Sequence, residues 1–389
     1  MPANLPPEAK AKFAKYMEAK TPEEKLEALK EFIASVPKHK GTENLLYWAR
    51  RRMAELREEV EERRRKKVGG RGPTFFVEKE GAAQVLLVGL ANSGKSMLLS
   101  RLTRAKAAVS SVPYSTRVPV PGMLMYEDVQ FQLVEAPSLI PGGGGWNNKV
   151  VGMAKNADAL AIVLDASSDP LEQLKVILKI LGDGGVVVKK PRGMVFIEKV
   201  RTGSGIQVIV NGALEGCTID DIRRILESYR IFSAIVKIYG RVTLDDVEES
   251  LFSARVYKPA VVLLNKVDLV NDVETVVNSL RKFVGSDIPI IPTSAVMGAG
   301  LDALGKTIFE LLDLIRIYTK PPNGKPSDKP LVVKRGTTVL EVAKLIHSRL
   351  YKDFAYARIW GPSAKYPGQK VGADHVLEDG DVVEIHTKR

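Results

Sequence analysis

Short apolar runs separated by amphipathic segments dominate the middle of the chain. The runs span residues 84–88, 129–134, 159–164, 260–264 and 288–291 and are rich in valine, isoleucine and leucine. Segments with apolar residues at helical spacing lie between them, at 97–104, 273–283 and 301–314. Strands that alternate with helices predict an α/β domain with a mostly parallel sheet covered on both faces. Such a sheet binds its ligands at the carboxyl ends of the strands.

The first 73 residues have a helical pattern and a high density of charge. Thr21 and Glu24 form a capping box around Pro22, and a break at 37–41 precedes a second helix from about 43 to 67. Its basic end at 63–67 is either an arm that contacts RNA phosphates or a solvated helix in which glutamates pair with arginines. Both interpretations stay open. The glycines of 69–73 predict a hinge.

The segment between the runs at 159–164 and 260–264 is too long for one crossover. Paired strands are expected at 193–200 and 205–210, a capped helix from Thr218 to Tyr229, a strand at 231–238 and a second helix from Thr243. We therefore expect an inserted α+β subdomain at about 172–250, within a domain that spans 74–328.

The last part of the chain has a pattern of its own. Residues 320–330 are rich in proline, glycine and lysine, which is typical of a linker. After it, a strand from Leu331, a helix at 339–350 capped by Thr338 and Glu341, and strands at 357–360 and 382–386 predict a small domain at 329–389. A short mixed sheet crossed by one helix, without a catalytic cluster, favours a binding role.

Composition narrows the class of protein. Hydrophobic residues make up 45% and charged residues 27%, no run is long enough to span a bilayer, and Cys217 is the one cysteine. We expect a cytoplasmic protein without membrane contact or internal disulfide, monomeric in isolation. The formal net charge of +12 suits RNA or another polyanion, but it is also compatible with a basic surface that binds no nucleic acid.

A glycine-rich loop follows the first apolar run, between a predicted strand and a predicted helix. The pattern is G-x-x-x-x-G-K-[ST], in which backbone N–H groups and the helix N-terminus surround phosphate oxygens. In it, Lys95 would reach the β- and γ-phosphates and the Ser96 hydroxyl would hold Mg²⁺. The predicted phosphate-binding residues are Gly89, Asn92, Ser93, Gly94, Lys95, Ser96 and Met97.

A second motif follows the strand at 260–264. Asp268 can accept both the ring N1–H and the amino group of guanine, a pair of donors that adenine lacks. Asn265 would support the loop and the base, and the stem of Lys266 would cover the face of the base. Ser294 and Ala295 follow the next strand, where a backbone N–H would meet the guanine carbonyl.

Together these motifs resemble the Obg class of GTPases and, more closely, the developmentally regulated GTP-binding protein (DRG) family, over essentially the full chain. Further matches are Tyr114-Ser115-Thr116, Val120-Pro121-Gly122-Met123, and the segments 368–375 and 377–383. The resemblance implies an inserted GTPase domain and a C-terminal TGS domain of ubiquitin-like (β-grasp) fold. It also implies GTP hydrolysis to GDP coupled to ribosomes, ribosomal RNA or translation, and a regulatory protein partner of the kind that DRG proteins have.

Two further residues are carried over from the family. Thr116 stands where the switch threonine meets Mg²⁺ and the γ-phosphate, which with Lys95 makes it a predicted catalytic residue. Asn92 stands where potassium-stimulated GTPases place an asparagine that coordinates K⁺, although a polar loop residue there needs no cation. The resemblance thus implies GTP/GDP and Mg²⁺ as cofactors, and leaves K⁺ open.

The third family motif departs from its pattern. Glu135 and Ser138 stand where the family has the aspartate and glycine of Asp-x-Pro-Gly, so the indirect bond of Glu135 to Mg²⁺ through water must be re-aimed. Leu139 follows, where Ras-like enzymes have a water-positioning glutamine, and no catalytic base is evident. The glycines of 142–145 predict a movable switch segment.

Three functions compete. The first is a slow GTPase that acts on the ribosome or its RNA. The second is a GTP-binding scaffold that has lost hydrolysis through Glu135 and Ser138. The third is an ATPase, which Asp268 argues against because adenine would leave its acceptor oxygens unpaired.

Overall fold

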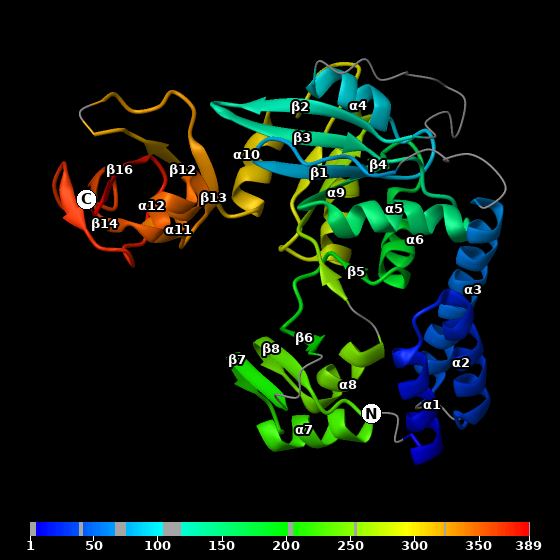
Figure 1. Cartoon of the computed structure of the whole chain (residues 1–389). Helices are drawn as coiled ribbons and strands as arrows, with labels where there is room; N and C mark the ends of the chain where they lie inside the picture. Colours follow the sequence, from blue (N-terminus) through cyan, green and yellow to red (C-terminus); the bar gives the residue numbers. More distant parts are fainter. Residues whose placement is uncertain are drawn as a thin grey trace. The chain divides into compact units, whose positions relative to one another are not determined.

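A computed structural model of the chain describes residues 5–38, 42–66, 75–103, 118–200, 205–252, 255–322 and 324–388 (Figure 1). The chain divides into two compact units. One comprises Met1–Thr74, Gly142–Lys149 and Leu181–Tyr257; the other comprises Phe75–Pro141, Val150–Ile180 and Lys258–Arg389. None of the helices in the described residues has the length and apolarity needed to cross a membrane.

The second unit contains the predicted α/β sheet. Its strands are β1 (Ala83–Val88), β2 (Val120–Tyr126), β3 (Val129–Glu135), β4 (Ala159–Asp165), β10 (Ala260–Asn265) and β11 (Ile290–Pro292). They are arranged β11-β10-β4-β1-β3-β2, and each is parallel to its neighbour except β2, which pairs antiparallel with β3. The mostly parallel sheet is confirmed. We missed β2 because Pro121 and Gly122 interrupt its pattern, which an edge strand tolerates.

Helices surround this sheet. They are α4 (Lys95–Leu102), α5 (Gly144–Asn156), α6 (Pro170–Asp183), α9 (Val273–Val284) and α10 (Ala303–Leu311), with a short 3₁₀ turn, η1 (Val267–Leu269). Val85 and Leu87 of β1 pack in one buried cluster with Leu98 of α4 and Ile308 of α10, so α4 and α10 cover the same face. Strand residues point alternately to the two faces, and the fully buried pattern of β1 therefore requires cover on both.

The C-terminal sheet begins earlier than predicted. Its strands are arranged β13 (Leu331–Lys334), β12 (Leu314–Thr319), β16 (Asp381–Thr387), β14 (Phe354–Trp360) and β15 (Gln369–Val371). The helix expected at 301–314 ends at Leu311, and the segment 320–330, expected as a linker between domains, joins β12 to β13 inside this sheet. The domain thus starts at β12 rather than at 329. Ile315 and Ile317 of β12 pack with Val339 and Val342 of α11 (Val339–Ile346), which α12 (Ser348–Lys352) follows.

The first unit is formed by the N-terminal helices and the inserted subdomain. The helices are α1 (Pro7–Glu18), α2 (Pro22–Ser35) and α3 (Glu43–Lys66). The insertion contains the sheet β6-β8-β7, made of β6 (Gly193–Lys199), β8 (Ala234–Val242) and β7 (Ile206–Leu214), with α7 (Ile219–Ser228) and α8 (Leu244–Phe252). The predicted pairing of the first two strands is wrong, because β8 lies between β6 and β7 and pairs with both. Two short parallel strands, β5 (Val186–Val187) and β9 (Val256–Tyr257), pair where the chain enters and leaves it. The predicted capping boxes at Thr21 and Thr338 and the predicted helix cap at Thr218 are confirmed.

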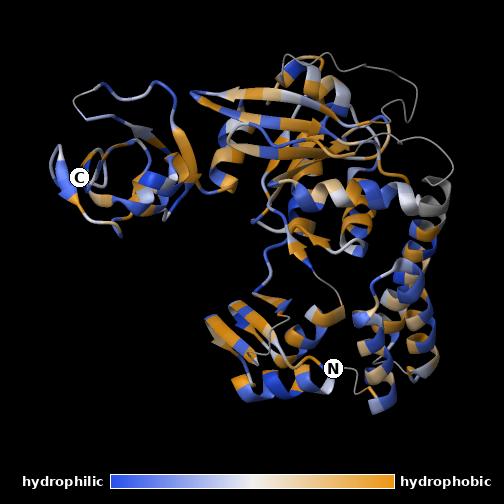
Figure 2. Ribbon diagram, viewed as in Figure 1, coloured by the Kyte–Doolittle hydropathy of each residue, from blue (hydrophilic) through white to orange (hydrophobic). Residues whose placement is uncertain are grey.

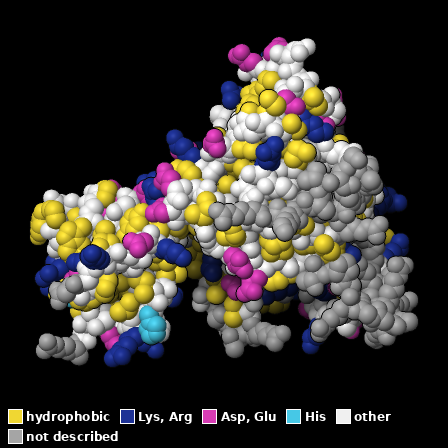
Figure 3. Space-filling model, turned by 90° about the horizontal axis from the view of Figure 1, so that it is seen from above, with side chains coloured by type: hydrophobic (Ala, Val, Ile, Leu, Met, Phe, Trp, Pro, Cys, Tyr) yellow, Lys and Arg dark blue, Asp and Glu magenta, His cyan; other side chains and the backbone are white. Residues whose placement is uncertain are grey.

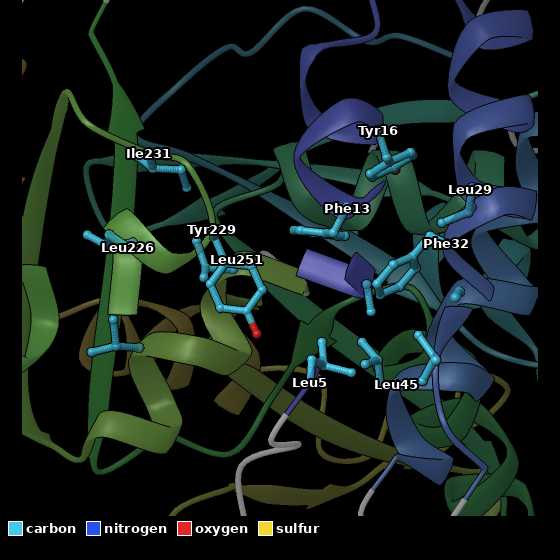
Figure 4. Packing of buried hydrophobic residues seen from close by; sticks show 14 of the residues in the cluster. Leu5, Phe13, Tyr16, Leu29, Phe32, Leu45, Leu226, Tyr229, Ile231 and Leu251 are labelled. Atoms are coloured by element: carbon cyan, nitrogen blue, oxygen red, sulfur yellow. The ribbon is translucent and has the colours of Figure 1, made fainter. Parts of the chain in front are cut away.

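One hydrophobic core joins the N-terminal helices to the insertion (Figure 4). Phe13 of α1 is 1% exposed, and its ring lies 4.6 Å from that of Phe252 and 5.9 Å from that of Tyr229, measured between centroids. Lys10 Nζ also donates to Ser228 Oγ at 3.1 Å. Two regions that we expected as separate, about 200 residues apart in the chain, therefore share one core.

Two arginines of the charge-rich α3 pair with the same glutamate. Glu55 forms ion pairs with Arg51 at 3.2 Å and with Arg52 at 2.8 Å. These pairs favour the solvated-helix interpretation for this part of α3. The side chains of the basic end at 63–67 lie outside the described residues, and so does the hinge expected at 69–73. On the face seen in Figure 3, basic side chains are dispersed among acidic and hydrophobic ones.

Candidate nucleotide-binding site

The loop after β1 turns sharply into α4. Gly94 is the N-cap of α4 at φ 90°, a conformation that side chains rarely adopt. A Cβ on Gly94 would lie 2.2 Å from Asn265 Nδ2, and one on Gly89 would lie 2.7 Å from Val163 O. Glycine is thus required at both ends of the loop. The loop leads directly into the N-terminus of α4, where free N–H groups and the helix dipole favour an anion.

Asn92 and Met97 occupy two different parts of this turn. Asn92 is exposed and has φ 63°, a left-handed conformation that asparagine tolerates better than most residues. This backbone requirement alone explains an asparagine there, so it leaves the potassium prediction untested. Met97 lies in the first turn of α4.

Lys95 is buried beneath the loop. Lys95 is only 4% exposed. Its Nζ donates to Leu90 O at 2.8 Å, Gly89 O at 3.3 Å and Ser138 Oγ at 3.0 Å. Burial lowers the pKa of Lys95 to about 8, against the opposing charge of Glu135. A phosphate oxygen that bonds to this ammonium would have to replace one of the three acceptors.

Ser96 and Glu135 meet beside Lys95. The Ser96 hydroxyl donates to Glu135 Oε1 at 2.5 Å, and Glu135 is 1% exposed at the end of β3. A hydroxyl and a carboxylate are oxygen donors of the kind that Mg²⁺ takes, so the two residues fit this ion. The longer side chain of Glu135 therefore still reaches Ser96. Thr116, the third predicted Mg²⁺ ligand, lies outside the described residues.

The carboxamide of Asn265 bridges two loops. Its Nδ2 donates to Ser93 O at 3.0 Å, and its Oδ1 accepts from the N–H of Ala295 at 3.1 Å. Asn265 and Ser93 are each 1% exposed, and Ala295 is 3% exposed. One side chain thereby fastens the glycine-rich loop to the segment that begins at Ser294. Its position at the end of β10 follows from the sheet, whose parallel strands end at one edge.

The predicted base-reading residues come together at the same edge. Ser294 Oγ donates to Asp268 Oδ1 and accepts from the N–H of Met297 at 3.0 Å, which orients the exposed Asp268 carboxylate in η1. Lys266 adopts φ 65° and pairs with Asp165 at 2.5 Å. Burial opposes ionisation of Asp165, but the Lys266 and Ser167 hydrogen bonds hold its pKa below the usual value.

Some contacts at this edge were not predicted. Asp165 ends β4, beside the P-loop strand, and no motif pointed to its pair with Lys266. Arg101 of α4 donates to Val296 O at 2.9 Å, which connects α4 to the loop after β11. Val296 and Met297 are 56% and 73% exposed, so this loop presents apolar surface next to Ser294. The signal available in the sequence was their position directly after the Ser294-Ala295 motif.

A parallel sheet with this loop before its first helix, and with the Asn265 motif after a later strand, defines a P-loop GTPase domain. Comparison with known families agrees. The model of the MMR_HSR1 family, described as a 50S ribosome-binding GTPase, matches residues 84–197. The model of the C-terminal region of that domain matches 203–314, and the TGS domain model matches 315–387. The start of the TGS match coincides with β12.

Relatives cover nearly the whole chain. An uncharacterized GTP-binding protein of Methanocaldococcus jannaschii is 36% identical over 373 residues, which are 94% of this chain and 93% of the relative. Developmentally-regulated GTP-binding protein 1 of Xenopus laevis is 33% identical over 362 residues (92% and 96%), and developmentally-regulated GTP-binding protein 2 of Homo sapiens is 31% identical over 373 (94% and 99%). The chain belongs to the developmentally regulated GTP-binding protein family. Among solved structures, a GTP binding protein from Pyrococcus horikoshii aligns with a TM-score of 0.45 at 16% identity, over 78% of this chain and 100% of that one.

Proposed function

We propose that this GTP-binding protein is a slow GTPase that acts on the ribosome or its RNA in translation, in the cytoplasm. The observation that carries the proposal is the Asn265 bridge, which holds the phosphate loop and the base loop as parts of one site. The two loops come from segments about 170 residues apart, and a nucleotide is a ligand that needs both at once.

Each side of the site has a separate task. The backbone from Gly89 to Gly94 surrounds the phosphates, and Lys95 neutralises their charge. Asp268 accepts the two guanine donors, and its bond from Ser294 keeps its carboxylate in place for them. The N–H of Ala295 already donates to Asn265, so Ala295 supports the loop, and the guanine carbonyl needs another donor from it.

Ser96 and Glu135 would hold Mg²⁺, with Thr116 and the phosphates. The bound ion supplies positive charge to the phosphate oxygens on which negative charge develops. Lys95 adds a second positive charge from the protein and positions the phosphate chain. K⁺ at Asn92 belongs to the same proposal, supported by the exposure of its side chain.

Turnover of GTP is the direct test. Purified protein with Mg²⁺ should release phosphate from GTP, and Lys95→Ala should abolish the release because the buried ammonium is lost. The rate of phosphate release by wild type and by Asn92→Ala, compared between K⁺ and Na⁺ buffers, measures the potassium dependence of turnover. Equal inactivity of wild type and Lys95→Ala would refute the enzyme.

A GTP-binding scaffold without turnover is the second candidate. The contact of Ser138 Oγ with Lys95 Nζ favours it, because the family's glycine has no side chain to compete for this ammonium. If it is correct, wild type binds GTP and GDP without releasing phosphate, and Glu135→Asp with Ser138→Gly raises turnover. If wild type turns over GTP and the double variant does so at the same rate, the scaffold is excluded.

Base selectivity separates GTP from ATP. ATP should fail to displace labelled GDP at a thousandfold excess, because adenine would leave the acceptors of Asp268 unpaired. In Asp268→Ala the preference should shrink by at least a hundredfold. Competition by ATP at equal concentration would overturn the guanine assignment.

Several features support a ribosomal partner. The net charge is +12, the matching family model is described as a 50S ribosome-binding GTPase, and the TGS domain offers a binding module without a catalytic cluster. Truncation after Leu312, just before β12, should weaken co-sedimentation with ribosomes while GDP binding persists. Undiminished co-sedimentation would exclude the TGS domain as a ribosome contact. A regulatory protein partner and a monomeric state in isolation complete the proposal, and sedimentation velocity measures the latter.

A further inference from the structure

The small sheet of the insertion has one covered face and one open face. Val236 and Ile238 of β8 are fully buried in the core with Ile222 of α7 and Val247 of α8. The alternate residues of the strands point the other way, and in Figure 2 the strands of this sheet carry much hydrophobic colour. The open face carries Met194, Phe196, Glu198, Ile209, Lys237 and Tyr239.

Two aromatic side chains lie together on this open face. Phe196 of β6 is 46% exposed and Tyr239 of β8 is 40% exposed, and their rings are 5.9 Å apart at an interplanar angle of 80°. Ile209 of β7, opposite Lys237, is 45% exposed. Single exposed apolar residues are ordinary, but adjacent ones on three neighbouring strands form a patch that indicates a partner.

The same face ends in positive charge. Arg192 and Arg241 lie two residues beyond Met194 and Tyr239, and the N–H of Arg241 donates to Arg192 O at 2.9 Å. A cavity of about 510 Å³ has Met194, Arg192 and Arg241 in its lining, together with Lys189 and Lys190.

Carboxylates also line the cavity, but they are engaged. Glu215 lies 3.6 Å from Arg241, Glu249 pairs with Arg255, and Asp246 accepts from Thr243 at 2.8 Å. Within the part of the chain that the structure describes, Lys189, Lys190 and Arg192 form no ion pair. Their charge is therefore available to an anionic ligand.

We propose that this open face binds single-stranded RNA. Bases stack on Phe196 and Tyr239, and the phosphates follow the sheet toward Arg192, Lys189 and Lys190. Exposed rings on a sheet next to unpaired cations fit an unpaired strand, which offers base faces and phosphates together. A duplex hides its base faces, and an apolar protein surface would leave the three cations without partners. The inference deepens the RNA role proposed above and rests on it.

The test uses the full chain and a fluorescein-labelled oligouridine of twelve nucleotides, titrated by anisotropy. Phe196→Ala and Tyr239→Ala should each weaken binding about tenfold, since stacking contributes that much per base. Phe196→Tyr and Tyr239→Phe keep a ring and should bind as wild type does. Phe232→Ala is the matched control, because Phe232 is 66% exposed in the same subdomain but precedes β8 and lies outside the face.

Charge and position are measured separately. Replacement of Lys189, Lys190 and Arg192 by glutamine should reduce the slope of log affinity against log salt by about 2, at about 0.7 per phosphate contact in single strands. Oligonucleotides with 4-thiouridine should cross-link to β6 or β8. Any of three results overturns the proposal. The first is a Phe196→Ala, Tyr239→Ala double variant that binds the oligonucleotide within twofold of wild type. The others are equal affinity for a duplex and cross-links that form only outside the insertion.

GTP turnover distinguishes this inference from the proposed enzyme. The aromatic variants should retain wild-type turnover, because the face contains no residue of the nucleotide site. If RNA binding depends on Phe196 and Tyr239 but the protein does not turn over GTP, the proposal that it is a GTPase is refuted and the proposal that this face binds RNA stands.

Discussion

Replacement of Asn265 by alanine tests the bridge on which the nucleotide site depends. The change removes the donor to Ser93 O and the acceptor of the Ala295 N–H, at 3.0 and 3.1 Å. Both backbone groups belong to residues that are at most 3% exposed, so water does not easily replace the lost amide.

The magnitude follows from the two buried groups left without partners. Each such group costs about 1–3 kcal/mol, which gives a loss of about 3 kcal/mol in the free energy of unfolding when partial relaxation is allowed. The two loops also lose their link, and a misplaced Ala295 segment no longer presents Asp268 to the base. We expect GDP affinity to fall at least tenfold, equivalent to about 1.4 kcal/mol.

Two variants separate the possible causes. Asn265→Asp keeps the shape and the acceptor of the Ala295 N–H but turns the donor into an oxygen that faces Ser93 O, so it should be at least as damaging as alanine. Asn278→Ala removes an exposed asparagine of α9 that makes no side-chain hydrogen bond to any residue the structure describes. It should change neither the free energy of unfolding nor the GDP affinity.

The measurements are urea unfolding followed by circular dichroism and calorimetric titration with GDP. If Asn265→Ala binds GDP as wild type does, the bridge does not organise the site and the reasoning is wrong. If Asn265→Asp is as stable as wild type, the donor to Ser93 O has no role.

Three further perturbations have definite expectations. Phe13→Ala should destabilise the first unit by about 3–5 kcal/mol and reduce amide protection in α7 and α8 by hydrogen exchange; unchanged protection there would contradict the shared core. GDP affinity should be flat below pH 8 and fall up to tenfold per pH unit above it, because the phosphates need protonated Lys95, whose pKa is about 8 in the free protein; calorimetry that finds constant affinity to pH 9.5 would exclude this. Asp379→Ala removes bonds from Arg316 N and Nη2 at 2.6 and 2.7 Å and should destabilise the TGS domain by about 2 kcal/mol. Its GDP affinity should stay within twofold of wild type, and a larger loss would place Asp379 in the nucleotide site.

Local signals in the chain were enough for the main elements of the GTPase sheet. The strands β1, β4 and β10 are mainly apolar runs, and β3 carries two glutamines among its apolar residues. Both Gly94 and Lys95 stand in a motif whose chemistry requires them. Such signals work because a buried parallel strand and a phosphate loop each constrain their own residues directly. The edge strand β2 escaped, since Pro121 and Gly122 remove the alternation on which its prediction would depend.

The TGS boundary shows how a composition signal misleads. The segment 320–330 has the proline and glycine content of a linker, yet it is a loop between β12 and β13. Its pairing with β13 on one side and with β16 on the other shows to which sheet β12 belongs. Pairing partners are distant in the chain, so no property of residues 314–319 alone discloses them.

The amino-acid order alone identified the phosphate loop, the guanine motif, the family resemblance and the altered Glu135 and Ser138. Folding in three dimensions was needed for the rest: the Asn265 bridge, the contact of Ser138 with Lys95, and the core in which Phe13 meets Tyr229. The physical reason is the range of the interactions. Backbone conformation and strand burial leave their mark on neighbouring residues, whereas hydrogen bonds and side-chain packing between remote segments exist only after the chain has closed upon itself.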